Sequence, residues 1–221
     1  MNQSLKTYDE LIELLYLLDK ALERKFPDSE LSVKLEVVGG FALLYHGLRI
    51  ENQFSRDIDT YNEVSSWLWK TAYDIDGSNW LNDGPTNLLH KVYPSIKNHI
   101  KFVKDTKYRF PYDHLELWVA TLDSVLGMKL DALRRQAEEG HSLLSTNRLN
   151  DITDFKEIVS VFDIDTPAGL LKEYPYLRPF FRKSYIKTDE KISKEDLEKM
   201  REDNTVEKIN LFEKFVLFEK G

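Results

Sequence analysis

Hydrophobic positions along the chain change their spacing several times, and each spacing predicts an element. The first segment, residues 7–26, repeats leucine at helical spacing, at Leu11, Leu14, Leu15, Leu18 and Leu22. Thr7 and Glu10 fit a capping box, so this helix is predicted to begin at Thr7. The apolar run 33–38 (VKLEVV) then predicts a short strand.

The rest of the chain mixes strands and helices. Gly39-Gly40 predicts a turn, followed by a helix over 41–48 and a strand over 57–61. The further predicted elements, in chain order, are a helix over 63–73, a loop over 77–87, strands over 99–105 and 114–120 joined as a hairpin, helices over 121–139 and 150–161, a loop-rich stretch punctuated by Pro167, Pro175 and Pro179, and a helix over 192–218. Because strands and helices do not alternate regularly, we expect an α+β fold (mixed α/β), with a small mixed sheet flanked by helices.

Composition and charge exclude several classes of protein. Hydrophobic residues make up 42% of the 221, which suffices for a sizeable core. The sequence contains no run of 18 apolar residues, so no membrane span is predicted. The N-terminal residues lack the pattern of a signal peptide. The chain has no cysteine, which excludes disulfides and suits a cytoplasmic protein. A net charge of −7 excludes a broad basic footprint, so contact with nucleic acid would need a local patch.

The most unusual chemistry lies in Asp57-Ile58-Asp59. Residues two apart on a strand face the same side, so both carboxylates would be presented together. Such a pair repels itself unless a cation lies between the charges, and oxygen ligands suit Mg²⁺ or Mn²⁺. A bare Asp-x-Asp is more often a solvated surface feature. The preceding Gly39-Gly40 turn, however, would let backbone approach a phosphate, and together the two features predict a site for a nucleoside triphosphate and its metal.

These residues resemble the polymerase-beta-like nucleotidyltransferases, and most closely the bacterial group of AbiEii-type toxins and related nucleotidyltransferases. The first block of the resemblance comprises Gly39, Gly40, Ala42, His46, Gly47, Arg49, Ser55, Asp57, Ile58 and Asp59. The second comprises Lys129, Leu130, Ala132, Arg134, Arg135, Arg148, Asp151 and Asp154. In this order the blocks cover most of residues 35–160.

The resemblance implies a nucleotidyltransferase domain over residues 1–165 and a loop-rich and helical extension over 166–221. It also implies a third catalytic carboxylate from a neighbouring strand. Glu116 is the first candidate and Asp113 the second. Without a third acid, nucleotide binding would remain while catalysis would be in question.

The expected site residues follow from the same comparison. Catalysis and metal binding are assigned to Asp57, Asp59 and Glu116. Nucleotide binding is assigned to Gly39, Gly40, Ser55, Arg56 and Lys129, with support from Arg49, Asp151 and Asp154. Three assignments have structural alternatives: Ser55 as a loop cap, Arg56 as a solvated charge, and Lys129 as the partner of Asp151.

The expected activity is transfer of a nucleoside monophosphate from an NTP to an acceptor hydroxyl on RNA, such as tRNA, or on protein. The resemblance suggests the toxin-like component of a toxin–antitoxin system, with a cognate antitoxin as partner. The alternatives are a small-molecule nucleotidyltransferase and a non-catalytic nucleotide-binding or partner-binding member. Residues 178–187 interleave basic and aromatic side chains and form either an RNA-facing patch or a plain surface segment. The four tryptophans are interpreted as core, with stacking on a base as the alternative.

Overall fold

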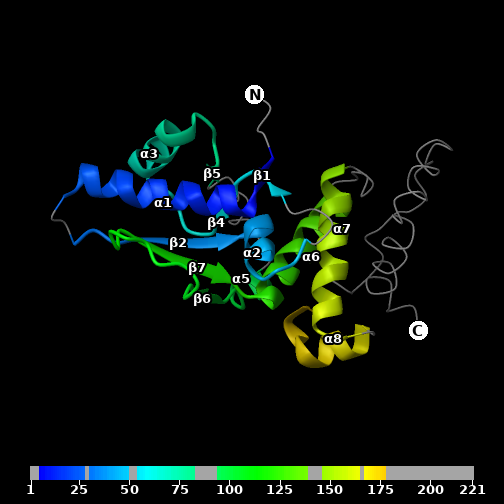
Figure 1. Ribbon diagram of the computed structural model, residues 1–221. Coiled ribbons are helices and arrows are strands. Elements are labelled where there is room, and N and C mark those ends of the chain that lie inside the picture. The colour runs from blue at the N-terminus through cyan, green and yellow to red at the C-terminus, as the bar shows by residue number, and fades with distance from the viewer. Residues whose placement is uncertain are drawn as a thin grey trace. The chain divides into compact units, whose positions relative to one another are not determined.

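The computed structural model describes residues 5–27, 30–49, 54–82, 94–138, 146–164 and 167–177 (Figure 1). The chain divides into two compact units, which are described separately. The sheet unit comprises Met1–Val92 and Ile100–Val125, and the helical unit comprises Tyr93–His99 and Leu126–Gly221. The division falls within α6 (Leu122–Glu138), whereas the sequence predicts a domain boundary near residue 165, which stays a prediction.

The first helix, α1 (Tyr8–Lys25), confirms the predicted capping box. The backbone N–H of Glu10 donates to Thr7 Oγ1 at 3.2 Å, and the Thr7 N–H donates to Glu10 Oε2 at 2.6 Å. The predicted leucine stripe is the buried side of this helix. Phe26 caps the C-terminal end, directly before Pro27.

A five-stranded mixed sheet forms the centre of the sheet unit, in the order β5-β4-β2-β7-β6. Its strands are β2 (Val33–Val38), β4 (Ile58–Thr60), β5 (Leu81–Asn82), β6 (Phe102–Lys104) and β7 (Leu115–Ala120). β2 runs parallel to β7 and antiparallel to β4, β4 runs parallel to β5, and β6 runs antiparallel to β7. A separate pair joins β1 (Lys6–Thr7) to β3 (Phe54–Ser55). The mixed sheet confirms the expected α+β class, and the antiparallel β6–β7 pair confirms the expected hairpin.

Two features of the sheet unit differ from the sequence analysis. Residues 81–82 form the edge strand β5 within a segment expected to be a loop, and a strand of two residues is too short to show a period. Gly39 does not lie in a separate turn before a helix, because α2 (Gly39–Tyr45) begins at that residue. Gly39 makes the change from strand to helix itself, with a φ of +66°.

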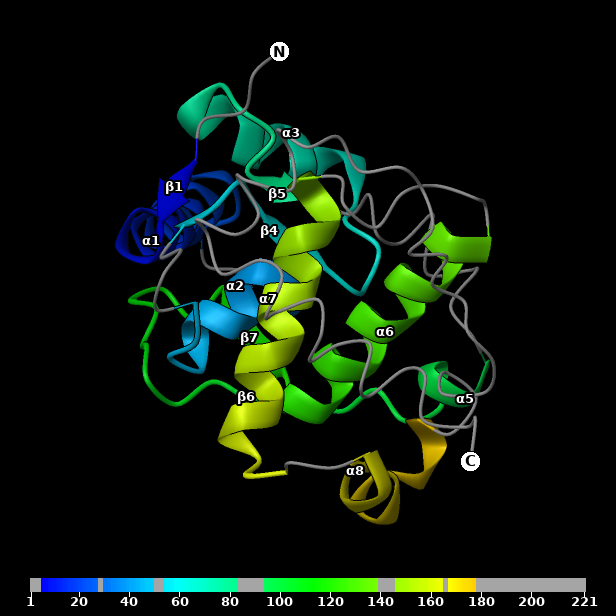
Figure 2. The ribbon, with the colours of Figure 1, turned by 90° about the vertical axis from the view of Figure 1, so that its right-hand side faces the viewer.

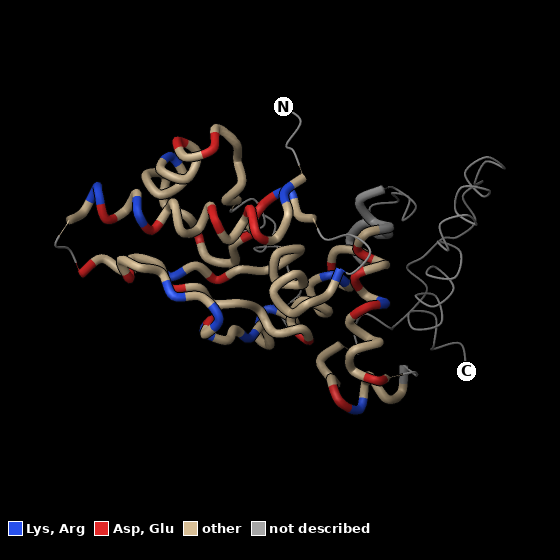
Figure 3. The backbone as a smooth tube through the Cα atoms, viewed as in Figure 1, with Lys and Arg blue, Asp and Glu red and all other residues tan. Residues whose placement is uncertain are grey.

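The two faces of the sheet differ in character. One face is apolar, and α1 and α2 cover it, while α3 (Ser66–Asp76) packs on α1 and beside the edge strand β5 (Figure 1). The opposite face, here called the polar face, carries charged, amide and aromatic side chains: Lys34, Glu36, Asp59, Tyr61, Asn82, Phe102, Lys104, Glu116 and Trp118. In the sheet unit acidic and basic positions are interspersed, as Figure 3 shows along α1.

The helical unit contains α5 (Pro94–Lys97), most of α6, α7 (Thr146–Val161) and α8 (Pro167–Glu173) (Figure 2). Its buried side chains include Leu130, Leu133, Phe155, Ile158 and Leu170. α8 occupies a stretch expected to be loop, and its proline stands at the first helical position, where a missing N–H leaves no hydrogen bond unmade. The predictions for residues 178–187 and 192–218 lie outside the described residues. Within the described residues, no helix is both long and apolar enough to cross a membrane.

Candidate functional site

The two aspartates face the same side of the sheet, as their spacing predicts. Asp57 directly precedes β4, and Asp59 lies within it, paired in register with Asn82 of β5. The Asn82 Nδ2 atom donates to Asp57 Oδ2 at 3.3 Å and to Asp59 Oδ1 at 3.2 Å. One amide group therefore bridges the two carboxylates.

The local electrostatics of Asp57 oppose its ionised form. Burial raises the pKa of Asp57 above its ordinary value. The hydrogen bond from Asn82 and the positive charges of Arg56 and Arg49 act in the opposite direction and only partly offset burial. A cation bound beside Asp57 would favour its charged form and would offset this desolvation.

Asn82 belongs to the candidate site but is not among the residues predicted from the sequence. Its backbone is held by the parallel pairing of β5 with β4, in which Asn82 lies opposite Asp59 and Ile58 N donates to the Trp80 carbonyl at 2.6 Å. The available signal was the apolar pair Trp80-Leu81 followed by a polar amide, which resembles the end of a buried strand. Trp80 is fully buried.

Both glycines lie against side chains of the site. A Cβ atom on Gly39 would lie 2.6 Å from Asp59 Oδ2. On Gly40 it would lie 2.6 Å from Arg49 Nη1 and 2.8 Å from the Ser55 hydroxyl. A side chain at either position would displace a predicted site residue, so close approach of protein groups accounts for the glycine pair independently of any phosphate.

The residues around the glycines form a hydrogen-bonded loop. Arg49, which adopts a left-handed φ of 64°, donates from Nη1 to the Phe54 carbonyl at 3.0 Å. Ser55 is buried, and its hydroxyl donates to the Asp57 carbonyl at 3.1 Å, which corresponds to the loop-capping alternative. Arg56 is exposed, as the solvated alternative expects.

The structure does not bring Glu116 to the aspartate pair. Glu116 does share the polar face, but it pairs in register with Lys34, four residues from the Val38 that pairs with Asp59. That offset is about 13 Å along the strands, with two strand spacings across the sheet in addition. Glu116 instead accepts hydrogen bonds from Lys104 Nζ and Trp118 Nε1, each at 3.1 Å. The alternative, Asp113, precedes β7 and lies farther along the same direction.

Three more of the expected residues belong to the helical unit. The Lys129 ammonium lies 2.5 Å from Asp151 Oδ1 and 2.7 Å from Asp154 Oδ2. The Lys129 and Asp151 side chains are each 12% exposed and that of Asp154 is 3% exposed, so these charges are largely withdrawn from water. This geometry corresponds to the structural alternative for Lys129, with Asp154 as a second partner.

The donor set at the aspartate pair consists of oxygen atoms. Among the residues that the structure describes, no group of three or more His, Cys, Asp or Glu side chains could hold a metal ion. Asp57 and Asp59 offer two carboxylates, and rotation of the Asn82 amide would add a carbonyl oxygen. Hard oxygen donors of this kind fit Mg²⁺ or Mn²⁺ with water completing the coordination.

No protein-family model, curated protein or solved structure matches this chain. The chain is therefore described by its own fold and candidate site. It has a mixed α+β sheet with one helix-covered face and one polar face, and a bridged pair of carboxylates where β4 and β5 lie side by side.

Proposed function

We propose that the chain is a metal-dependent nucleotidyltransferase with a polymerase-beta-like core. The observation that carries the proposal is the pair Asp57 and Asp59, which share one donor, Asn82, at 3.2–3.3 Å and lie against Gly39. The sequence of elements supports it: strand β2, glycines, helix α2, then an adjacent antiparallel strand that carries the aspartates. This is the arrangement that the resemblance implies.

In this proposal Asp57 and Asp59 hold Mg²⁺ or Mn²⁺ with the triphosphate of an NTP. The bound metal would neutralise phosphate charge and polarise the reacting phosphoryl group. The chain's own residues orient the reactants: Arg49 is fixed by the Phe54 carbonyl and adds positive charge beside Asp57. Gly39 keeps the space that the Asp59 carboxylate occupies. Positioning and electrostatics of this kind account for most of the rate in phosphoryl transfer.

The acceptor is proposed on the resemblance alone. It is a hydroxyl group of RNA, such as tRNA, or of a protein, in a toxin–antitoxin setting with a cognate antitoxin. A small-molecule acceptor is the second enzymatic case.

One observation favours a second function, metal-dependent nucleotide binding without transfer. The neighbouring strand β5 presents an amide, Asn82, to the aspartates, and Glu116 lies in a different part of the polar face. The base that a third carboxylate would supply is therefore unassigned among the described residues.

Transfer of label from each α-labelled NTP to total RNA and to protein, with Mg²⁺ or Mn²⁺, tests the first function, and calorimetric titration with the same NTP and metal tests the second. The double variant D57N/D59N keeps side-chain shape and removes the charge. D74N is the matched control, because Asp74 is an exposed aspartate on α3 that pairs only locally with Lys70. Label that D74N retains and D57N/D59N loses would support transfer. Metal-dependent NTP binding without label would support the second function, and neither result in wild type would refute both.

A further inference from the structure

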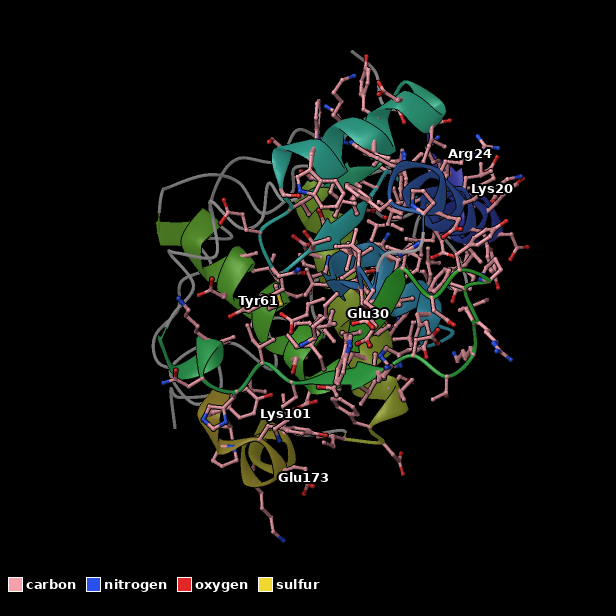
Figure 4. The ribbon with its side chains drawn as sticks, turned by 90° about the vertical axis from the view of Figure 1, so that its left-hand side faces the viewer. Lys20, Arg24, Glu30, Tyr61, Lys101 and Glu173 are labelled. Carbon is pink, nitrogen blue, oxygen red and sulfur yellow. The ribbon has the colours of Figure 1, made fainter. Side chains whose placement is uncertain are left out.

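Two aromatic side chains meet on the polar face close to the aspartate pair. The ring centroids of Tyr61 and Phe102 are 5.4 Å apart, with their planes tilted by 51°. Tyr61, labelled in Figure 4, directly follows β4, and Phe102 begins β6. β2 and β7 separate these strands, so the two side chains reach toward each other across the middle of the sheet.

The register of the sheet fixes where this aromatic pair lies. Asp59 on β4 pairs with Val38 on β2, and Phe102 on β6 pairs with Ala120 on β7. These four residues lie in one line across the sheet, with Asp59 and Phe102 at its two ends. Tyr61 follows Asp59 by two residues and therefore lies on the same face, about 7 Å along the strand. Val38 and Ala120 are buried, at 1% and 0% exposure, and are small enough to leave room for rings above the sheet.

Both residues remain partly exposed, so a ligand can reach their rings. Trp118 of the same face is already engaged. Its Nε1 donates to Glu116, and the Lys34 ammonium lies 4.4 Å from its ring centroid. Among these three aromatic residues, the Tyr61–Phe102 pair is both nearest in register to Asp59 and less committed to charged neighbours.

We infer that Tyr61 and Phe102 form the stacking surface for the base of the nucleotide whose phosphates bind at Asp57 and Asp59. The inference rests on the proposed function and assigns the nucleoside end of the same site. Three strand spacings, about 14 Å, separate Asp59 on β4 from Phe102 on β6, and Tyr61 follows the strand of Asp59 itself. The two rings meet between these positions, within reach of the ribose and 5′-phosphate of a nucleotide held at the aspartates. Stacking on aromatic rings tolerates every base, because each base has a π-face. The surface therefore binds nucleobases without strong selection among them.

Calorimetric titration separates stacking from phosphate binding. Wild type, Y61L, F102L and Y61F are titrated with ATP and with inorganic tripolyphosphate, each in excess Mg²⁺. Y61L and F102L should weaken ATP binding by roughly 5- to 100-fold, the range expected for losing one base-stacking ring, and should leave tripolyphosphate binding unchanged. Y61F keeps the ring and should bind ATP within about 2-fold of wild type. W69L is the matched control, because Trp69 is an exposed aromatic stacked on Tyr73 in α3.

Each result decides the inference. Unchanged ATP affinity in Y61L and F102L would overturn it while leaving the proposed function intact. An equal loss for ATP and tripolyphosphate would also overturn it, because the change would then report a damaged phosphate site. If wild type bound neither ligand, the proposed function would fail and the stacking surface with it.

Discussion

Replacing Gly39 by alanine tests whether the Asp59 carboxylate depends on the space beside this glycine. Gly39 has a φ of +66°, a conformation that costs an L side chain about 1–2 kcal/mol. The added Cβ would also lie 2.6 Å from Asp59 Oδ2, whereas ordinary contact begins at 3.4 Å. The carboxylate or its strand must therefore move by about 0.8 Å.

Two other glycines supply controls that isolate the second effect. Gly47 and Gly77 have φ values of +79° and +69°, and a Cβ on either would meet nothing within 4 Å. G47A and G77A should each lower the free energy of unfolding by about 1–2 kcal/mol through backbone strain alone. Their metal-dependent ATP binding should equal that of wild type.

G39A should be less stable than either control and should weaken metal-dependent ATP binding by roughly 10-fold or more, since a shift near 1 Å disturbs a preorganised site. Urea denaturation measures the first effect and calorimetric titration with Mg²⁺ and ATP the second. If G39A matched G47A in both measurements, the close approach of Gly39 to Asp59 would have no energetic consequence, and the reasoning would be refuted.

Three further predictions concern buried charge and hydrogen bonding. K129M should lower the free energy of unfolding in urea by about 3–5 kcal/mol, because it removes the ammonium group that two buried carboxylates, Asp151 and Asp154, contact. K70M is the control: Lys70 forms an exposed ion pair with Asp74, and its loss should change the free energy of unfolding by less than about 0.5 kcal/mol. Hydrogen bonds to the Leu31 carbonyl and then to Glu23 raise the pKa of His114, so its stabilising effect should be complete below about pH 6.5 and should fall as pH rises through the folded-state pKa. In melting temperatures measured over a series of pH values, H114Q should lack this loss of stability with rising pH. The same pH dependence in H114Q and wild type would show that His114 does not cause it. N82D should be about 1 kcal/mol less stable than wild type in EDTA, because a third carboxylate repels the pair, and Mn²⁺ should restore its melting temperature; a variant insensitive to Mn²⁺ would exclude a cation site there.

The spacing of residues close together in the sequence correctly predicted the features that depend only on such neighbours. The capping box of α1 depends on Thr7 and Glu10, three residues apart, and both hydrogen bonds are present. The shared direction of Asp57 and Asp59 follows from the period of a strand and from nothing else. β5 could not be found this way, since two residues at a sheet edge carry no period, and its Asn82 was missed with it.

The case of Glu116 shows where such reasoning stops. Alternation along β7 correctly predicts that Glu116 shares a face with Asp59, but the distance between them depends on register. Register is set by pairing between β2, β4 and β7, and a single strand's sequence does not contain it. The same holds for the glycine pair: the sequence predicts a close approach to a phosphate, while only the fold shows that Asp59 and Arg49 lie against these glycines.

The net charge of the side chains at the aspartate pair determines how much positive charge the proposed ligands must bring. With Asn82 in register beside Asp59, the described donor set carries two negative charges and one neutral amide. One divalent cation neutralises that set, and further positive charge for a triphosphate must come from Arg49, from Arg56 or from ions that the nucleotide itself carries. A third carboxylate would add one more negative charge to the set, which a second cation would offset. In the proposed enzyme the amide therefore lowers the negative charge that the metal must neutralise, and transfer would need a base from the acceptor or from another part of the chain.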